Sequence, residues 1–128
     1  MQRQIDREEI IQNYIEGYNQ FDIKKMIADF DDEITFENVQ NGQINLSLKG
    51  MNAFRQQAEL AKNYFVTRQQ QIKSFKHLDN QTEIEIDYKA VLAIGFPNGL
   101  KSGQELSLTG KSVFDFAGDK IIKLTDLS

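Results

Sequence analysis

The stretch that decides the fold is residues 10–38, which read IIQNYIEGYNQFDIKKMIADFDDEITFEN. At an advance of ~100° per residue, its first part places apolar side chains along one stripe of a helix, as in helices that cover a core. That stripe comprises Ile10, Ile11, Tyr14, Tyr18 and Phe21. Asp6 and Glu9, three residues apart, form a capping-box pattern, which predicts that the helix begins at Asp6.

A second, short helix and a first strand follow without a long connection. After Asp22, apolar side chains recur at helical spacing at Ile23, Met26, Ile27 and Phe30. Residues 34–39 then alternate, which predicts a strand with Ile34, Phe36 and Asn38 on one face. We therefore expect the apolar sides of all three elements to converge on one space.

The second half of the chain is dominated by strand patterns. Asn41-Gly42 predicts a turn before a short strand at 44–48, and Gly50 opens a third helix. Longer strands are expected at 66–78, 82–94 and 104–116, with a loop around 95–103. In a last strand, Ile122, Leu124 and Asp126 are expected to share a face. Early helices and later strands predict an α+β fold with the helices on one side of a sheet.

Composition excludes several classes of protein. With 128 residues, the chain is expected to be a single domain, 1–128, that buries its own core. The absence of cysteine excludes disulfides, thiol catalysis and cysteine-based metal sites. A net charge of −4 argues against nucleic-acid binding, which requires clustered cations. No membrane segment or secretory signal is recognisable, so we expect a cytoplasmic location.

The order and spacing of three segments resemble the nuclear transport factor 2-like superfamily, in particular its SnoaL-like bacterial members. The segments are YIEGYNQFDIKKMIADFDDEITFEN, the helix opening Gly50-Met51-Asn52-Ala53-Phe54, and GKSVFDFAGDKIIKLTDLS. The resemblance implies a cone, in which a strongly bent antiparallel sheet wraps around about three helices and encloses a pocket. It also implies a homodimer formed through the sheet. Members range from isomerases, cyclases, dehydratases and hydrolases to non-catalytic binding modules, so the fold leaves the function open.

The ketosteroid isomerases of this superfamily allow a comparison of individual residues. They use a tyrosine and a protonated aspartic acid as an oxyanion hole, and a second aspartate as the base. By resemblance, Tyr14 stands at the position of the tyrosine and Ser112 near that of the protonated acid, whereas Asn38 replaces the base. Because a side-chain amide does not take up a proton near neutral pH, isomerisation by that mechanism is not expected.

Four polar side chains on the predicted inner faces have two interpretations each. Tyr14 and Tyr18 are either core tyrosines whose hydroxyls find a partner, or donors to a ligand. Asn38 is paired either with the protein or with a ligand, because a buried amide needs a partner. Asp126 either lies in apolar surroundings, with a raised pKa suited to acid–base chemistry, or faces water at a frayed strand end.

Two other candidates are assigned to the surface. His77 precedes the turn at Asp79-Asn80, and we expect it to be a solvated residue rather than a proton carrier. The acidic residues 31–33 lack the spacing of a calcium-binding loop and are expected to form a solvated connection.

We therefore expect the cone to bind a small, largely apolar organic molecule. The residues expected to line it are Tyr14, Tyr18, Phe36, Asn38, Phe54, Ile86, Tyr88, Leu108, Ser112, Phe114 and Asp126. If the protein is an enzyme, we expect acid–base chemistry of an isomerase, cyclase or dehydratase type, without cofactor or metal. Tyr14 would then be the hydrogen-bond donor and Asp126 the base. The alternatives are a non-catalytic ligand-binding module and a dimerisation or interaction module whose side chains fill the cone.

Overall fold

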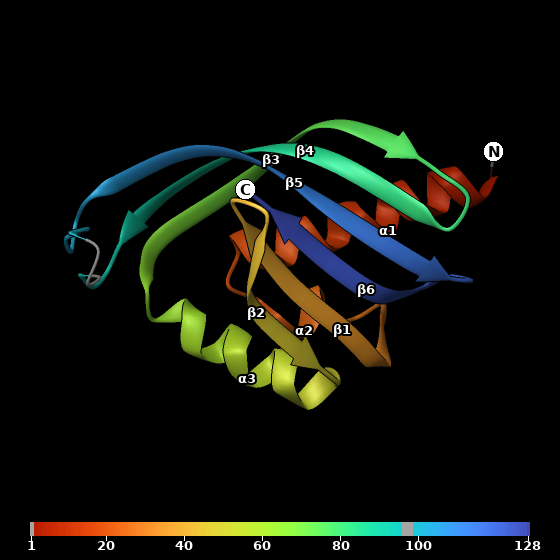
Figure 1. Ribbon diagram of the computed structural model, residues 1–128, viewed down its shortest axis with the longest axis horizontal. Coiled ribbons are helices and arrows are strands. Elements are labelled where there is room, and N and C mark those ends of the chain that lie inside the picture. Colours follow the sequence, from red (N-terminus) through yellow and green to blue (C-terminus); the bar gives the residue numbers. More distant parts are fainter. Residues whose placement is uncertain (1, 96–98) are drawn as a thin grey trace.

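The computed structural model describes residues 2–95 and 99–128 (Figure 1). Its elements are α1 (Gln2–Asn19), α2 (Ile23–Met26), β1 (Phe30–Gln40), β2 (Gln43–Lys49), α3 (Met51–Lys62), β3 (Phe65–His77), β4 (Gln81–Leu92), β5 (Glu105–Ala117) and β6 (Lys120–Leu127). The α+β class predicted from the sequence is confirmed. Part of the predicted loop, residues 96–98, lies outside the described residues.

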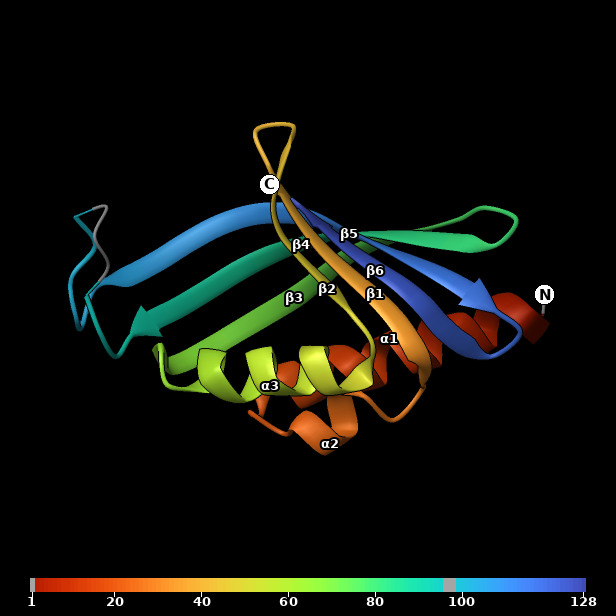
Figure 2. The same cartoon turned by 60° about the horizontal axis from the view of Figure 1, so that its bottom comes forward.

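One curved sheet arches over the helices, with α1, α2 and α3 on the same side (Figures 1 and 2). The strand order is β2-β1-β6-β5-β4-β3. Neighbouring strands are antiparallel except β1 and β6, which are parallel. The expectation of a purely antiparallel sheet is therefore wrong at this pair. β1 and β6 are separated in the sequence by the other four strands, so no hairpin turn links them. Only a hairpin turn would force the two strands to be antiparallel.

The core lies between the concave face of the sheet and the helices. Its buried apolar residues are Ile11, Tyr14, Ile15, Ile23, Met26, Ile27, Phe30, Ile34, Phe54, Ala58, Ile84, Phe114, Phe116, Ile121 and Leu124. Residues 10–38 contribute half or more of this cluster, as the helical and alternating patterns predicted. The three elements of that stretch do converge on one space.

Gly17 allows α1 and α2 to approach closely. A Cβ atom at this position would lie 2.7 Å from the backbone nitrogen of Met26 and 3.1 Å from the carbonyl oxygen of Asp22. Real Cβ atoms do not come so near to backbone atoms. The glycine therefore weakens the helix intrinsically but is required by the packing of the next element against it.

Three local features differ from the sequence-based expectations. Helix α1 begins at Gln2, so Asp6 is not its N-cap; Asp6 is exposed within the first turns. The acidic residues 31–33 belong to β1 and do not form a connection. In β6, Ile121 is buried and Ile122 is 38% exposed, which reverses the expected face. The register between β5 and β6 shifts between Asp115 and Phe116, and this bulge moves Ile121 inward.

The turn at Asn41-Gly42 is confirmed. Both residues have positive φ, 54° and 78°, as a tight hairpin of this kind requires. The hairpin that it closes projects from the body of the molecule (Figure 2). None of the described helices is long and apolar enough to cross a membrane.

Candidate functional site

A cavity of about 210 Å³ opens inside the concave side of the sheet, close to the C-terminal end of β6. Its lining residues are Tyr18, Asn38, Gln70, Ile86, Tyr88, Leu108, Thr109, Gly110, Lys111, Ser112, Asp126, Leu127 and Ser128. A Cβ at Gly110 would lie 3.2 Å from the carbonyl oxygen of Leu127, so this glycine lets β5 and β6 come together at the cavity. An apolar cavity of ~150 Å³ is known to admit benzene, so this space is large enough for a molecule with one ring.

Asp126 and Ser112 form a hydrogen-bonded pair in the cavity. They are direct partners in the pairing of β5 with β6, which places both side chains on the same face of the sheet. The Ser112 hydroxyl donates to Oδ1 of Asp126 over 2.7 Å. Burial raises the pKa of Asp126 from 3.8 to about 6, although the hydrogen bond from Ser112 lowers it. Both protonation states of Asp126 are therefore accessible near neutral pH, as general acid–base chemistry requires.

Tyr18 and Tyr88 form a second polar pair in the same cavity. Their hydroxyl oxygens lie 2.7 Å apart, and either hydroxyl can be the donor. Burial is the main cause that raises the pKa of both phenols, so both keep their protons at neutral pH. Two hydroxyl hydrogens are available and the bond between the rings uses one. The pair therefore has one hydrogen left to donate to a ligand.

Arg68 packs against the ring of Tyr18 and is hydrogen-bonded to its backbone. Its guanidinium carbon lies 3.8 Å from the centre of the Tyr18 ring and 4.5 Å from that of Phe21. Its Nε donates to the carbonyl oxygen of Tyr18 over 2.8 Å, near the end of α1, where the same oxygen also accepts from the backbone nitrogen of Phe21. Only 4% of Arg68 is exposed. This buried cation over an aromatic face fixes the position of the tyrosine pair.

The structure places the residues predicted to line the cone in two groups. Tyr18, Asn38, Ile86, Tyr88, Leu108, Ser112 and Asp126 line the cavity. Tyr14, Phe54 and Phe114 are instead buried in the core, against which Phe36 packs, and none of these four is part of the cavity lining. The Tyr14 ring stacks on Phe30 and meets Phe114 edge-on, each with ring centres 5.7 Å apart.

Asn38 and His77 both have partners within the protein. Asn38 lies at the cavity and donates to Oδ1 of Asn45 over 2.8 Å. His77 was expected to be solvated, but its side chain is only 13% exposed. Its ring nitrogens lie 3.0 Å from Thr82 Oγ1 and 2.8 Å from Glu8 Oε2, so it links the β3–β4 hairpin to α1. That expectation is wrong because the position of the helix over the turn was not visible in the sequence.

Sequence patterns missed two residues of this region, Arg68 and Gln70. Both lie on β3 at inward positions that alternate with exposed neighbours. In a sequence, a buried polar side chain cannot be told from a solvated one. The alternation along β3 therefore predicted only a strand of mixed polarity. The spacing of Arg68, Gln70 and Ile72 was the one signal that could have shown which face is covered.

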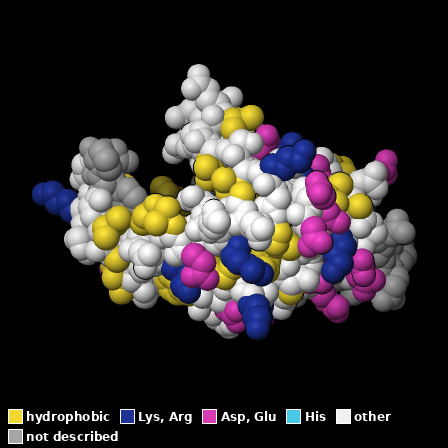
Figure 3. All heavy atoms as spheres, turned by 90° about the horizontal axis from the view of Figure 1, so that it is seen from below, with side chains coloured by type: hydrophobic (Ala, Val, Ile, Leu, Met, Phe, Trp, Pro, Cys, Tyr) yellow, Lys and Arg dark blue, Asp and Glu magenta, His cyan; other side chains and the backbone are white. Residues whose placement is uncertain are grey.

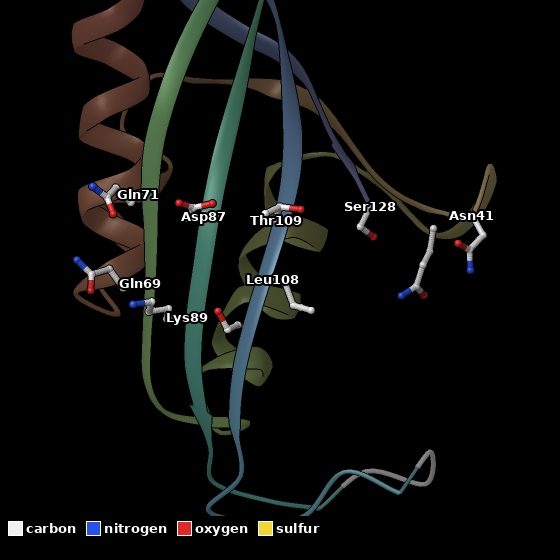
Figure 4. A pocket seen from close by; sticks show the side chains of 10 residues that line it. Asn41, Gln69, Gln71, Asp87, Lys89, Leu108, Thr109 and Ser128 are labelled. Atoms are coloured by element: carbon white, nitrogen blue, oxygen red, sulfur yellow. The ribbon is translucent and has the colours of Figure 1, made fainter.

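A larger hollow of about 730 Å³ extends along the outer face of the sheet and shares Leu108, Thr109 and Ser128 with the lining of the cavity. Gln69, Gln71, Asp87, Lys89 and Thr109 line one side of it on β3, β4 and β5, across from Asn41 and Ser128 (Figure 4). Figure 3 shows the molecule hollowed between the projecting β1–β2 hairpin and the far end of β4 and β5. Among the described residues that line this hollow, the only acidic side chain is the partly exposed Asp87, with no hydrogen-bonded partner like that of Asp126 in Ser112, so we assign the candidate chemistry to the smaller cavity.

Comparisons with known proteins agree with the cone geometry. No protein-family model and no curated protein matches the sequence. Among solved structures, a provisionally named polyketide cyclase from Xanthomonas campestris pv. campestris superposes with a TM-score of 0.82 at 20% identity, covering 100% of this chain and 93% of its own. An NTF2-like protein of unknown function from Burkholderia pseudomallei K96243 gives 0.77 at 10% identity, covering 94% and 88%. The chain has the nuclear transport factor 2-like fold.

A third structure extends this comparison. A protein with a ketosteroid isomerase-like fold from Catenulispora acidiphila DSM 44928, in complex with trimethylamine, gives a TM-score of 0.75 at 13% identity, covering 92% of this chain and 83% of its own. The resemblance inferred from the sequence is thus confirmed for the fold. The cavity with Asp126 is lined by residues of α1, β1, β3, β4, β5 and β6.

Proposed function

We propose that the cavity binds a small, largely apolar organic molecule and that Asp126 exchanges a proton with it, without a cofactor. The observation that carries the proposal is the Ser112–Asp126 pair, whose carboxyl group has a pKa of about 6 and lies in the same cavity as the tyrosine pair. A cyclase-like reaction is the first choice because a provisionally named polyketide cyclase shares the fold. We retain a cytoplasmic location and a homodimer as parts of this proposal.

The proposed chemistry is proton abstraction next to a carbonyl group. The Asp126 carboxylate takes a proton from the carbon beside the carbonyl, and the electron pair of that C–H bond moves to the carbonyl oxygen. The free hydrogen of the Tyr18–Tyr88 pair donates to this oxygen as its negative charge develops. In a cyclisation, the carbanion-like carbon then attacks a second carbonyl carbon of the same molecule. Asp126 returns its proton to the alkoxide that forms, so the carboxylate is regenerated.

Tyr18 and Tyr88 take the donor role that the resemblance gave to Tyr14. Both tyrosines line the cavity, whereas Tyr14 is buried among Phe30 and Phe114. Burial also raises the pKa of Tyr14 well above its usual value, so its hydroxyl stays protonated. A donor must touch the oxygen whose charge it stabilises, and the residues that line the cavity meet this condition.

The proposal is tested by hydrogen–deuterium exchange at the methyl group of acetophenone in D₂O, followed by NMR. We expect the wild-type protein to accelerate exchange, with a rate that rises with pH through about 6 as Asp126 loses its proton. Asp126→Asn should lower the protein-catalysed rate by about 10²–10⁴-fold, the usual contribution of a general base. Asp119→Asn, in the exposed β5–β6 turn, is the matched control. Equal exchange by wild type and Asp126→Asn would contradict the proposal.

Non-catalytic ligand binding is the second candidate function. It is favoured by Asn38, because the amide that lies at the cavity cannot act as a base. This function predicts saturable binding of acetophenone, detected as chemical-shift changes of cavity residues, with no acceleration of exchange at any pH. It also predicts that Asp126→Asn binds as tightly as the wild type.

A further inference from the structure

Gln70 carries a buried acceptor that the protein does not use. Gln70 is 8% exposed, and its Oε1 atom has no hydrogen-bond partner among the described residues. Buried polar atoms in native proteins nearly always have a partner, so an exception of this kind needs an explanation. Gln70 also lines the cavity that contains Asp126. A ligand in this cavity is therefore the candidate for the missing partner of Oε1.

The position of Gln70 is fixed by its backbone. Asn19, the last residue of α1, accepts from the Gln70 backbone nitrogen over 2.7 Å and donates to its carbonyl oxygen over 3.1 Å. β3 is an edge strand, so Asn19 occupies backbone groups that would otherwise lack a neighbouring strand. With its backbone held in this way, Gln70 keeps its side chain on the inner face although the amide oxygen has no partner there.

Gln70 lies beside the tyrosine pair. Gln70 and Tyr88 are direct partners in the pairing of β3 with β4, so their side chains emerge on the same face as neighbours. The tyrosine pair has one hydroxyl hydrogen to donate, and the Gln70 amide has one oxygen to accept. Together they form an edge of the cavity that offers one donor and one acceptor side by side.

We propose that Gln70 and the Tyr18–Tyr88 pair form a recognition subsite for a ligand edge that carries a hydrogen-bond acceptor next to a donor, as in a hydroxy-carbonyl compound. The carbonyl oxygen accepts from the tyrosine pair, and the neighbouring hydroxyl donates to Oε1 of Gln70. A simple ketone or an ether has no hydrogen to donate, so it leaves Oε1 unpaired and gains no affinity from Gln70. This inference rests on the proposed function, because it names the substrate class of the same cavity.

The test compares two probes by NMR titration, 2-hydroxyacetophenone and its methyl ether 2-methoxyacetophenone, in which a methyl group replaces the donated hydrogen. We expect the wild type to prefer the hydroxy compound by about tenfold, the factor that corresponds to ~1.4 kcal/mol. Gln70→Met keeps the length of the side chain and removes the amide, so this preference should fall to about one. Gln69→Met is the matched control because Gln69 is exposed on the outer face of the same strand.

A second measurement separates recognition from a structural role. Because Oε1 is buried without a partner, Gln70→Met should raise the melting temperature of the free protein, by about 3–15 °C if the usual penalty for such an atom is removed. A residue that stabilises the fold would lower it. Loss of the preference together with a higher melting temperature is the expected result.

Three results would overturn this inference: an unchanged preference in Gln70→Met, a wild-type preference for the methoxy compound, or no binding of either probe. The acid–base function fails separately. If the preference depends on Gln70 but Asp126→Asn exchanges acetophenone as fast as the wild type, the subsite stands and the proposed reaction falls. If exchange depends on Asp126 but the preference does not depend on Gln70, the proposed reaction stands and the subsite falls.

Discussion

At the scale of single residues, the cavity and the side chains packed behind it combine groups whose burial costs stability. Asp126 is held where burial disfavours its charged form, and Gln70 keeps an acceptor without a donor. Arg68 places a positive charge among aromatic rings, with no ion pair to a carboxylate found within the described residues. Features of this kind gather at functional sites, because binding and proton transfer need groups that the fold alone would not favour.

The raised pKa of Asp126 predicts how stability depends on pH. Its folded-state pKa of about 6 exceeds the unfolded value of 3.8, so the folded protein binds the proton more tightly. This contribution to stability is fully present below pH 3.8 and is lost as the pH rises through about 6. In Asp126→Asn the side chain is a neutral amide at every pH, so the variant does not lose stability in this way as the pH rises. We therefore expect the variant to gain stability relative to the wild type between pH 4 and pH 7, in urea unfolding at several pH values.

The control for this measurement is again Asp119→Asn, whose side chain is exposed. It makes the same chemical change at an exposed position of the neighbouring turn, and the stability of Asp126→Asn is compared with it at each pH. A difference between Asp126→Asn and wild type that stays constant from pH 4 to pH 8 would show that the Asp126 carboxyl group is not perturbed.

At the scale of elements, Gly17 predicts the strongest local effect on packing. Gly17→Ala gains ~1 kcal/mol in helix propensity, but the added Cβ would meet the backbone of Met26. Overpacking costs about 1–3 kcal/mol, so the net effect is a fall in the free energy of unfolding of up to about 2 kcal/mol. The measurement is equilibrium unfolding in urea.

Gln12→Ala, on the exposed side of the same helix, is the control for Gly17→Ala. It should change the free energy of unfolding by no more than ~0.5 kcal/mol, as surface substitutions usually do. If Gly17→Ala is more stable than the wild type, the two helices can move apart without loss and the close approach is not required.

The elements also show how far the sequence could be interpreted. Residues 10–38 were predictable because their apolar side chains follow a single period in each segment, and burial enforces that period. β6 was placed on the wrong face at Ile121 and Ile122, since a bulge shifts the alternation and leaves no mark in the amino-acid pattern. Asp126 was still predicted to face inward, because it lies beyond the bulge and alternates with Leu124.

The candidate site was only half predictable for a related reason. Tyr88, Ser112 and Asp126 were found because they lie on strands whose other inward residues are apolar. Gln70 was missed, since what distinguishes it is an absent partner in three dimensions, and a sequence does not record absent contacts. Tyr14 was chosen over Tyr18 by resemblance, yet one helical turn separates a core ring from one that lines the cavity.

At the scale of the whole molecule, the outer face of the sheet is the surface for which we predict a second copy of the chain. The large hollow there is lined by amide and hydroxyl groups of β3, β4 and β5, and Leu108, which is 55% exposed, lies at its edge (Figure 4). The charges within it, Asp87 and Lys89, are of opposite sign and do not oppose self-association.

Light scattering at micromolar concentration measures this prediction. We expect the wild type to have the mass of a dimer and Thr109→Arg to have that of a monomer, because a bulky cation in the hollow blocks the contact. Gln56→Arg, which adds the same side chain on the exposed face of α3, should remain dimeric. A monomeric wild type, or a dimeric Thr109→Arg, would place the contact elsewhere or remove it.

The position of β6 has a consequence for how the protein is made. β6 is the sixth strand along the chain but the third across the sheet, between β1 and β5. During synthesis, the β1–β2 hairpin and the β3–β4–β5 meander can each form from neighbouring segments, but no strand pairs one with the other until β6 leaves the ribosome. Pairing of strands so far apart in the sequence is slow. Because β6 also carries Asp126, the sheet and the acid of its cavity are completed in the same late step.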